Sequence, residues 1–209
     1  MSPTNDDQRI PRRIRFQHQA ESLLLQLSIT AVLLLSACSN QSGDNTLQIK
    51  SPGTGAKNEQ VKSGYAYPIT KSFTDPSGKL STASNFRTYV ANYDLNATNF
   101  ALTLDRPLTA EDQVRVVFSL VGAEGTNDKS AVTAGTYSAK ADKFMKVDDV
   151  SIVSKKGNQD SKQTLDRGGL TGQVKLTSVS ADQITGDIDL TSGDDSIKGS
   201  FTAKILKRK

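Results

Sequence analysis

The C-terminal third of the chain alternates regularly between apolar and polar residues, which is typical of half-buried β-strands. Polar stretches separate three such groups. The residues at every second position are Val174 and Leu176; then Ile184, Gly186, Ile188 and Leu190; then Ile197, Gly199, Phe201, Ala203 and Ile205. Because the connections are short, the pattern predicts three consecutive antiparallel strands.

The last two of these strands also predict their own register. If Leu190 faces Ile197 across the connecting loop, Asp189 lies opposite Lys198 on the other face. Such an oppositely charged cross-strand pair stabilises a sheet by roughly a few tenths of a kcal/mol. A shift by one residue would bury Lys198, so only one register is favourable.

Two glycines, Gly186 and Gly199, fall near Phe201 in this register. Glycine inside a strand marks a site of close approach or strong curvature. We therefore expect the glycines either to make room for the Phe201 ring or to let the strands bend sharply.

The rest of residues 65–209 shows shorter alternations, with turn residues such as those of Asp75-Pro76-Ser77-Gly78 between them. Convincing amphipathic helices are absent. The predicted strands are 65–70, 86–93, 98–105, 113–121, 132–139, and segments near 148–154 and 171–178. The sequence predicts an all-β domain, an antiparallel β-sandwich or a small β-barrel of about 8–10 strands.

Two segments lack this pattern. Residues 155–169 form the longest stretch without alternation inside the predicted domain, and long irregular loops are often functional or disordered. Residues 38–64 are rich in Ser, Asn, Gly, Gln and Lys. Since such a composition buries too little apolar surface to offset the entropy of ordering, we interpret 38–64 as a flexible tether.

An apolar segment precedes the tether. Leu23 to Leu35 holds ten apolar residues among thirteen and no charge. The segment is shorter than the roughly 20 residues that a transmembrane helix needs. A basic region precedes it, with Arg9, Arg12, Arg13 and Arg15. A basic region, a short apolar run and a small-residue cleavage site are typical of a secretory signal peptide, here residues 1–37.

The end of this segment carries a specific motif. Leu35-Ser36-Ala37-Cys38 resembles the lipobox of bacterial lipoprotein precursors. The resemblance implies cleavage after Ala37, a diacylglyceryl group on the Cys38 thiol and acylation of the new amino group. It thus implies attachment to a membrane through lipid. Ser39 follows the cysteine, which in a Gram-negative organism implies the outer membrane; periplasmic and surface-facing orientations both stay open.

Composition excludes several classes of function. After residue 37 the chain has 22 Lys and Arg against 19 Asp and Glu, a net charge of +3. This near-neutral balance argues against nucleic-acid binding. Cys38 is the only cysteine, and the only histidine, His18, belongs to the predicted signal peptide. Without these residues the domain has no disulfide, thiolate metal cluster, Ser–His triad or Cys–His dyad. Phosphate loops and dinucleotide fingerprints are also absent, so no cofactor is predicted.

Two acidic pairs are candidate sites. Asp187 and Asp189 would lie about 6–7 Å apart on one strand face, which overlaps the spacing of glycosidase carboxylates. That face is the polar one, and Lys198 is available as a partner, so solvated surface acids are the simpler interpretation. Asp194 and Asp195 sit in a loop that lacks the ligand spacing of a calcium loop, and no metal site is predicted.

Aromatic residues concentrate near the start of the predicted domain. Tyr65 and Tyr67 share one strand face, as do Tyr89 and Tyr93. Aromatic edges stack on sugars or anchor protein partners, and these four tyrosines are the candidate binding residues. The alternative interpretation is that they complete the hydrophobic core.

These observations support a lipid-anchored, non-enzymatic envelope protein whose β domain binds an envelope protein or glycan or has a structural role. The alternative is a lipocalin-like carrier of a small apolar ligand, and a glycosidase-type enzyme is third. An interior filled by side chains favours the first function. An apolar cavity of about 300 Å³ or more favours the carrier.

Overall fold

The computed structural model describes residues 45–51, 55–97 and 103–207. All belong to one compact unit, Gly43–Lys209. The predicted signal peptide, Ala37, Cys38 and the first part of the predicted tether lie outside the described residues. Within the described part of the chain, no helix has the length and apolar composition needed to cross a bilayer.

The predicted all-β class is confirmed, since the described residues form eleven strands of one mixed sheet. The strands are β1 (Thr46–Ser51), β2 (Gly55–Gln60), β3 (Ser63–Thr74), β4 (Leu80–Ala91), β5 (Val114–Glu124), β6 (Gly135–Ser138), β7 (Lys146–Lys156), β8 (Gln159–Thr164), β9 (Thr171–Val179), β10 (Gln183–Ser192) and β11 (Asp195–Ile205).

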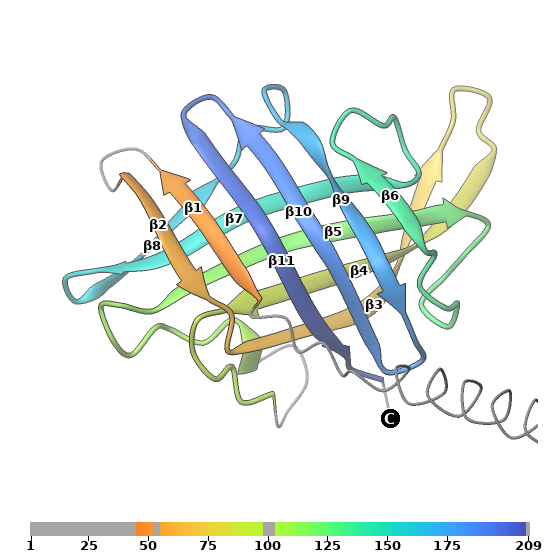
Figure 1. Cartoon of the computed structure of the whole chain (residues 1–209). Helices are drawn as coiled ribbons and strands as arrows, with labels where there is room; N and C mark the ends of the chain where they lie inside the picture. The colour runs from red at the N-terminus through yellow and green to blue at the C-terminus, as the bar shows by residue number, and fades with distance from the viewer. Residues whose placement is uncertain (1–44, 52–54, 98–102, 208–209) are drawn as a thin grey trace, which may run out of the picture. The chain divides into compact units, whose positions relative to one another are not determined.

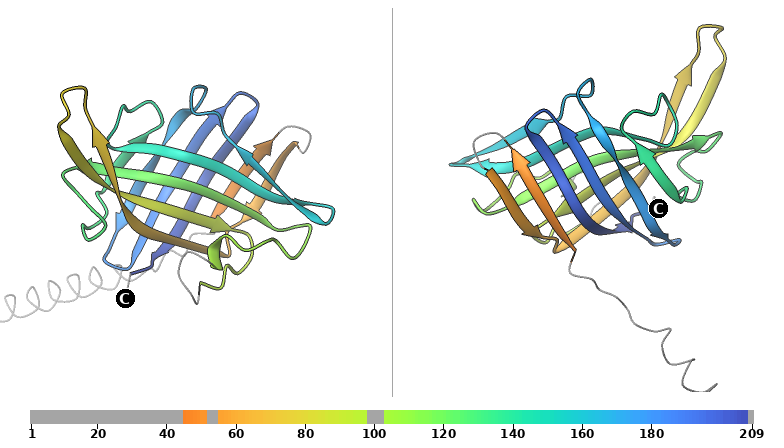
Figure 2. Two further views of the ribbon diagram at one scale, coloured as in Figure 1. Left: turned by 180° about the vertical axis from the view of Figure 1, so that it is seen from behind. Right: turned by 45° about the horizontal axis from the view of Figure 1, so that its top comes forward.

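The sheet curves so that its strands form two facing layers (Figure 1). One layer contains β1, β2, β6, β9, β10 and β11, and the other contains β3, β4, β5, β7 and β8. Figure 2 shows the second layer from behind, with its strands crossing those of the first. Two short parallel pairings link the layers, Ser138 with Lys146 in one and Lys204 and Ile205 with Tyr65 and Ala66 in the other. Because these links are so short, the predicted sandwich describes the sheet better than the predicted barrel.

The main hydrophobic core lies between the two layers. Phe86 on β4 and Phe118 on β5 belong to it from one layer, and Ile188 on β10 and Phe201 on β11 from the other. The rings of Phe118 and Phe201 meet edge to face, with centroids 5.3 Å apart. The compact unit thus has its own core and all the described strands, which are the properties of a domain that folds by itself.

The predicted register of the last two strands is confirmed. Leu190 on β10 pairs with Ile197 on β11, and Asp189 pairs with Lys198. The Lys198 ammonium lies 3.1 Å from the Asp189 carboxylate, and both side chains are exposed. An exposed pair of this kind adds at most about 1 kcal/mol, so burial of the apolar face is the larger determinant of the register.

Gly186 and Gly199 are required by neighbouring backbone rather than by the Phe201 ring. A Cβ atom on Gly199 would overlap the carbonyl oxygen of Thr46 on β1, and one on Gly186 would overlap the carbonyl oxygen of Lys175 on β9. Gly199 also has a φ of +134°, which side chains disfavour. Gly199 therefore allows β1 to lie close to β11, and Gly186 allows β9 to lie close to β10.

We expect Gly199→Ala to lower the free energy of unfolding by about 1–3 kcal/mol more than Gly78→Ala. Gly78 also has a positive φ, +83°, but no atom lies within 4 Å of a Cβ placed there. Because both glycines have a positive φ, the difference between the two variants reports mainly the overlap of the new Cβ atom with β1. Urea unfolding of both variants measures the difference, and equal losses would contradict this explanation of Gly199.

The prediction of a flexible tether at 38–64 is wrong from Thr46 onward. Residues 46–60 form the β1–β2 hairpin, and β3 begins at Ser63. Leu47 and Ile49 are buried in the main core while β1 pairs with β11. The composition of this segment suggested a flexible tether because β2 is largely exposed and contributes no large apolar residue. The burial of only two side chains, those of Leu47 and Ile49, stabilises the hairpin.

Two other predicted segments also differ from the structure. Residues 155–169 were predicted to be irregular, but β7 continues to Lys156 and forms a hairpin with β8. The polar sequence of β8 concealed an exposed edge strand. The predicted strand 98–105 is also wrong where the structure describes it, because Thr103 and Leu104 form a short helical turn; residues 98–102 lie outside the described residues.

Candidate functional site

The predicted tyrosines belong to a second, smaller core on the outer face of β3, β4 and β5. Tyr67 and Tyr89 are buried, and their rings stack with centroids 6.0 Å apart. Leu95 and Leu104, from the connection between β4 and β5, cover them. Tyr65 packs against the same cluster. Tyr67 and Tyr89 are therefore packing residues, and their ring faces are not open to a sugar.

A hydrogen-bonded chain continues from this cluster toward solvent. The Nε of Arg87 donates to the Tyr89 hydroxyl at 2.7 Å, and that hydroxyl donates to Asp105 at 3.0 Å. Burial and the hydrogen bond with Tyr67 raise the pKa of Tyr89 well above its ordinary value. Tyr89 therefore stays protonated at neutral pH, and the chain ties the β4–β5 connection to the sheet.

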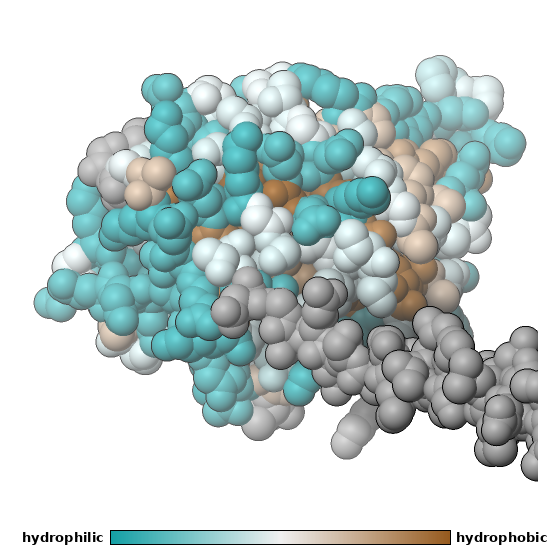
Figure 3. All heavy atoms as spheres, in the orientation of Figure 1, coloured by the Kyte–Doolittle hydropathy of each residue, from teal (hydrophilic) through white to brown (hydrophobic). Residues whose placement is uncertain are grey.

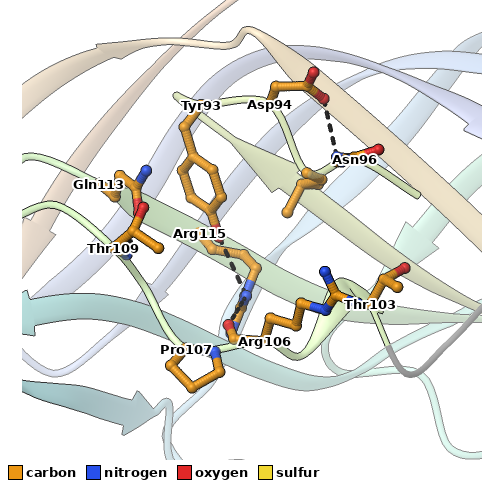
Figure 4. A pocket seen from close by; sticks show the side chains of 10 residues that line it. Tyr93, Asp94, Asn96, Thr103, Arg106, Pro107, Thr109, Gln113 and Arg115 are labelled. Carbon is orange, nitrogen blue, oxygen red and sulfur yellow. Dashed lines mark hydrogen bonds between the residues drawn. The ribbon is translucent and has the colours of Figure 1, made fainter. Parts of the chain in front are cut away.

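The fourth predicted tyrosine, Tyr93, lines a pocket of about 160 Å³ beside this cluster (Figure 4). The pocket lies between the end of β4, the connection that follows it and the start of β5. Its lining residues are Tyr93, Asp94, Leu95, Asn96, Thr103, Arg106, Pro107, Thr109, Gln113 and Arg115. Of the four predicted binding residues, Tyr93 lines this pocket, and Tyr65 lines a separate pocket between the start of β3 and the end of β11.

Arg115 is the unusual residue of this pocket. Its side chain is on β5 and only 4% exposed. One guanidinium nitrogen donates to the Tyr93 hydroxyl at 3.1 Å and to the Arg106 carbonyl oxygen at 2.9 Å. The Nε is buried without a hydrogen-bond partner. Burial raises the pKa of Tyr93, while the nearby charge of Arg115 lowers it.

A larger, apolar groove opens at the end of the main core. It measures about 710 Å³ and lies between β3, β4, the β5–β6 connection, the β9–β10 turn and the end of β11. In Figure 3 hydrophobic side chains reach the surface near the lower end of β9, where the groove lies. Its apolar lining residues are Pro68, Phe86, Ala131, Val132, Val179, Ala181 and Ile205.

Comparisons of the chain with protein-family models, curated proteins and solved structures find no match. The site is therefore interpreted from its own geometry.

The acidic residues weighed as catalytic or metal sites do not converge in a cleft. Asp187 and Asp189 are exposed on β10, and Asp189 pairs with Lys198. Both oxygens of Asp195 accept hydrogen bonds from Gln163 at 2.7 Å. Among the described residues, no group of three or more His, Cys, Asp or Glu side chains is placed to hold a metal ion.

Asp148 is the one buried carboxylate among the described residues, and it forms ion pairs with Lys71 and Arg167. Burial alone would raise its pKa, but the hydrogen bond from Lys71 at 2.5 Å and the charges of Lys71 and Arg167 outweigh burial and lower it. The Nε of Arg167 lies 3.3 Å from the same carboxylate. This cluster links β3 and β7 to the segment after β8.

Sequence reasoning missed both Arg115 and the groove. In the 113–121 alternation Arg115 falls on the face opposite Val116 and Phe118, and nothing in that pattern marks it as buried. That face is covered by the β4–β5 connection, where the alternation predicted a strand at 98–105 and did not indicate that the connection packs against β5. The one available signal was the apolar content of that connection, which includes Leu95 and Leu104.

Proposed function

We propose that this chain is a lipid-anchored protein of the bacterial cell envelope whose β unit binds a small apolar ligand and catalyses no reaction. The apolar groove of about 710 Å³ is the observation that carries the proposal. Its volume falls within the roughly 300–1,000 Å³ of small-molecule sites. It also exceeds the roughly 300 Å³ that favours a carrier of an apolar ligand. Because side chains fill the space between the two layers, the proposed site is a groove at the end of the core and not the enclosed interior of a lipocalin-like barrel.

The lining of the groove supports an amphipathic ligand with an aliphatic body. Phe86, Val132 and Ile205 form apolar walls next to the main core. Polar groups lie among the lining residues, with Lys129 and Lys207 as its cations. Because burial of each methylene group contributes about 0.8 kcal/mol, an acyl chain would gain most of its affinity from the walls.

The anchoring part of the proposal depends on the Leu35-Ser36-Ala37-Cys38 motif. A lipidated Cys38 would attach the β unit to a membrane, the outer membrane in a Gram-negative organism. Two or more acyl chains anchor a protein stably, whereas one binds only marginally. The membrane is thus the expected partner, and it is also a source of apolar ligands.

The other functions weighed from the sequence have less support. A glycan-stacking surface needs exposed aromatic rings, but Tyr67 and Tyr89 are buried. A glycosidase needs two carboxylates across a cleft, and Asp187 and Asp189 line neither the groove nor the Tyr93 pocket.

Tryptophan fluorescence tests the groove directly because the chain has no tryptophan of its own. Ala131 is exposed and lines the groove, so Ala131→Trp places a single reporter there. We expect a fatty acid with bromine on its acyl chain to quench this tryptophan saturably in the Gly43–Lys209 unit. The measurement is a fluorescence titration.

The matched control is Ala56→Trp, since Ala56 is exposed on β2 and does not line the groove. We expect no saturable quenching there. Adding Ala181→Phe to the Ala131→Trp reporter narrows the groove and should weaken binding about tenfold, equivalent to about 1.4 kcal/mol. Equal quenching of the two reporters, or unchanged binding with Ala181→Phe, would exclude the groove as the site.

A further inference from the structure

The Tyr93 pocket is separate from the apolar groove and shares no lining residue with it. Its central feature is the buried guanidinium of Arg115. Within the described ranges, no carboxylate lies within 4.0 Å of this side chain, and its Nε has no hydrogen-bond partner. A buried charge without a counter-charge is costly, and proteins usually pair such a charge with an ion or ligand.

The hydrogen bonds that Arg115 makes do not supply an opposite charge. The Tyr93 hydroxyl and the Arg106 carbonyl oxygen are neutral acceptors, and both bind the same guanidinium nitrogen. Figure 4 shows the tyrosine ring and the Arg106 backbone on either side of the guanidinium. These contacts fix the orientation of Arg115 and do not occupy its Nε.

The other charged groups around the pocket favour an anion. Arg106 is a second cation in the lining, and its side chain is solvent-exposed. Asp94 also lines the pocket, but it is exposed, accepts the Asn96 N–H at 2.9 Å and points away from Arg115 in Figure 4. Asp160 is close enough to raise the pKa of Tyr93, but its two oxygens accept the Leu108 N–H at 3.0 and 3.2 Å, and it forms no ion pair with Arg115 within 4.0 Å.

The size and polarity of the pocket restrict what can bind. Its volume of about 160 Å³ is similar to that of an engineered cavity of about 150 Å³ that holds benzene. Unlike that cavity, it is lined by polar side chains, including Asn96, Thr109 and Gln113. A polar group of a few heavy atoms fits, and an extended chain does not.

We infer that this pocket binds a compact oxyanionic group, a carboxylate or a phosphate, between Arg115 and Arg106. The guanidinium group is planar and presents its donors in a geometry that matches these oxyanions. Arg115 supplies the buried positive charge of the pocket, and Arg106 adds a second positive charge at the surface. This site is independent of the apolar groove and of the proposed apolar ligand.

The test follows the Nε–H proton resonance of Arg115 by NMR in the full-length protein, purified in a neutral detergent. Sodium phosphate and sodium acetate are added separately, against sodium chloride at equal ionic strength. We expect a saturable shift of this resonance with at least one oxyanion and none with chloride. A response to phosphate alone identifies a phosphate site, and a response to acetate alone identifies a carboxylate site.

Two variants complete the test. Arg106→Gln removes the exposed cation and should weaken the affinity for the oxyanion about tenfold or more. Lys175→Gln removes an exposed charge on β9 outside the pocket and should leave this affinity unchanged. If Arg115 serves only to hold the β4–β5 connection, its resonance will not respond to either oxyanion. That result, an equal response to chloride, or unchanged affinity in Arg106→Gln would overturn the inference.

Discussion

Phe201→Ala is expected to lower the free energy of unfolding of the Gly43–Lys209 unit by about 3–5 kcal/mol. Phe201 is fully buried between the two layers, and its ring meets Phe118 edge to face at 5.3 Å. Both layers contribute to the walls around it, so the cavity cannot close without moving one layer. Urea unfolding measures the loss as a lower midpoint with little change in slope.

Phe73→Ala is the matched control. Phe73 also meets another ring edge to face at 5.3 Å, that of Phe144, but it is only partly buried near the end of β3. We expect Phe73→Ala to lower the free energy of unfolding much less, on the order of 1 kcal/mol. Equal losses in the two variants would mean that the space between the layers is not the main core.

Cys38→Ser is expected to abolish lipid attachment completely. Cys38 is the only thiol of the chain, so no other residue can accept a thioether-linked diacylglyceryl group. Cells grown with an alkyne-labelled fatty acid should yield labelled wild-type protein and unlabelled variant. Intact mass should place the wild-type N-terminus at residue 38 with added acyl mass.

Ser39→Ala serves as the control because it changes the neighbouring residue and keeps the thiol. We expect this variant to be labelled like the wild type. Label retained by Cys38→Ser, or a wild-type chain that still begins at Met1, would refute the lipoprotein interpretation of the motif.

The C-terminal strands show why part of this fold can be predicted from sequence. β10 and β11 alternate strictly, and their loop is short, so only one register keeps Lys198 on the polar face. That register and its pair with Asp189 are confirmed. Local alternation and local pairing determine these strands, and both are visible in the sequence.

The strands that were missed depend on distant partners. β1 has only Leu47 and Ile49 to bury, and it is stabilised by pairing with β11, about 150 residues later in the chain. β8 has no large apolar residue and is a strand because β7 provides the hydrogen-bonding edge. Composition alone resembles disorder in such segments, since the stabilising surface lies elsewhere.

The candidate sites were predictable only in part. Four tyrosines were singled out, but the β4–β5 connection covers Tyr67 and Tyr89, and only Tyr65 and Tyr93 line pockets of the described structure. Arg115 was not singled out, because the alternation along β5 does not show that the β4–β5 connection covers its face. The groove draws on several segments far apart in sequence, so no single stretch signals it.

The most direct test of the proposed apolar-ligand function is a methyl NMR titration of the Gly43–Lys209 unit with a fatty acid. The account predicts saturable shifts at Val132, Val179 and Ile205, which line or border the groove, and none at Ile49 or Val153, which do not. Unchanged groove methyl groups, or shifts spread equally over both sets, would contradict it.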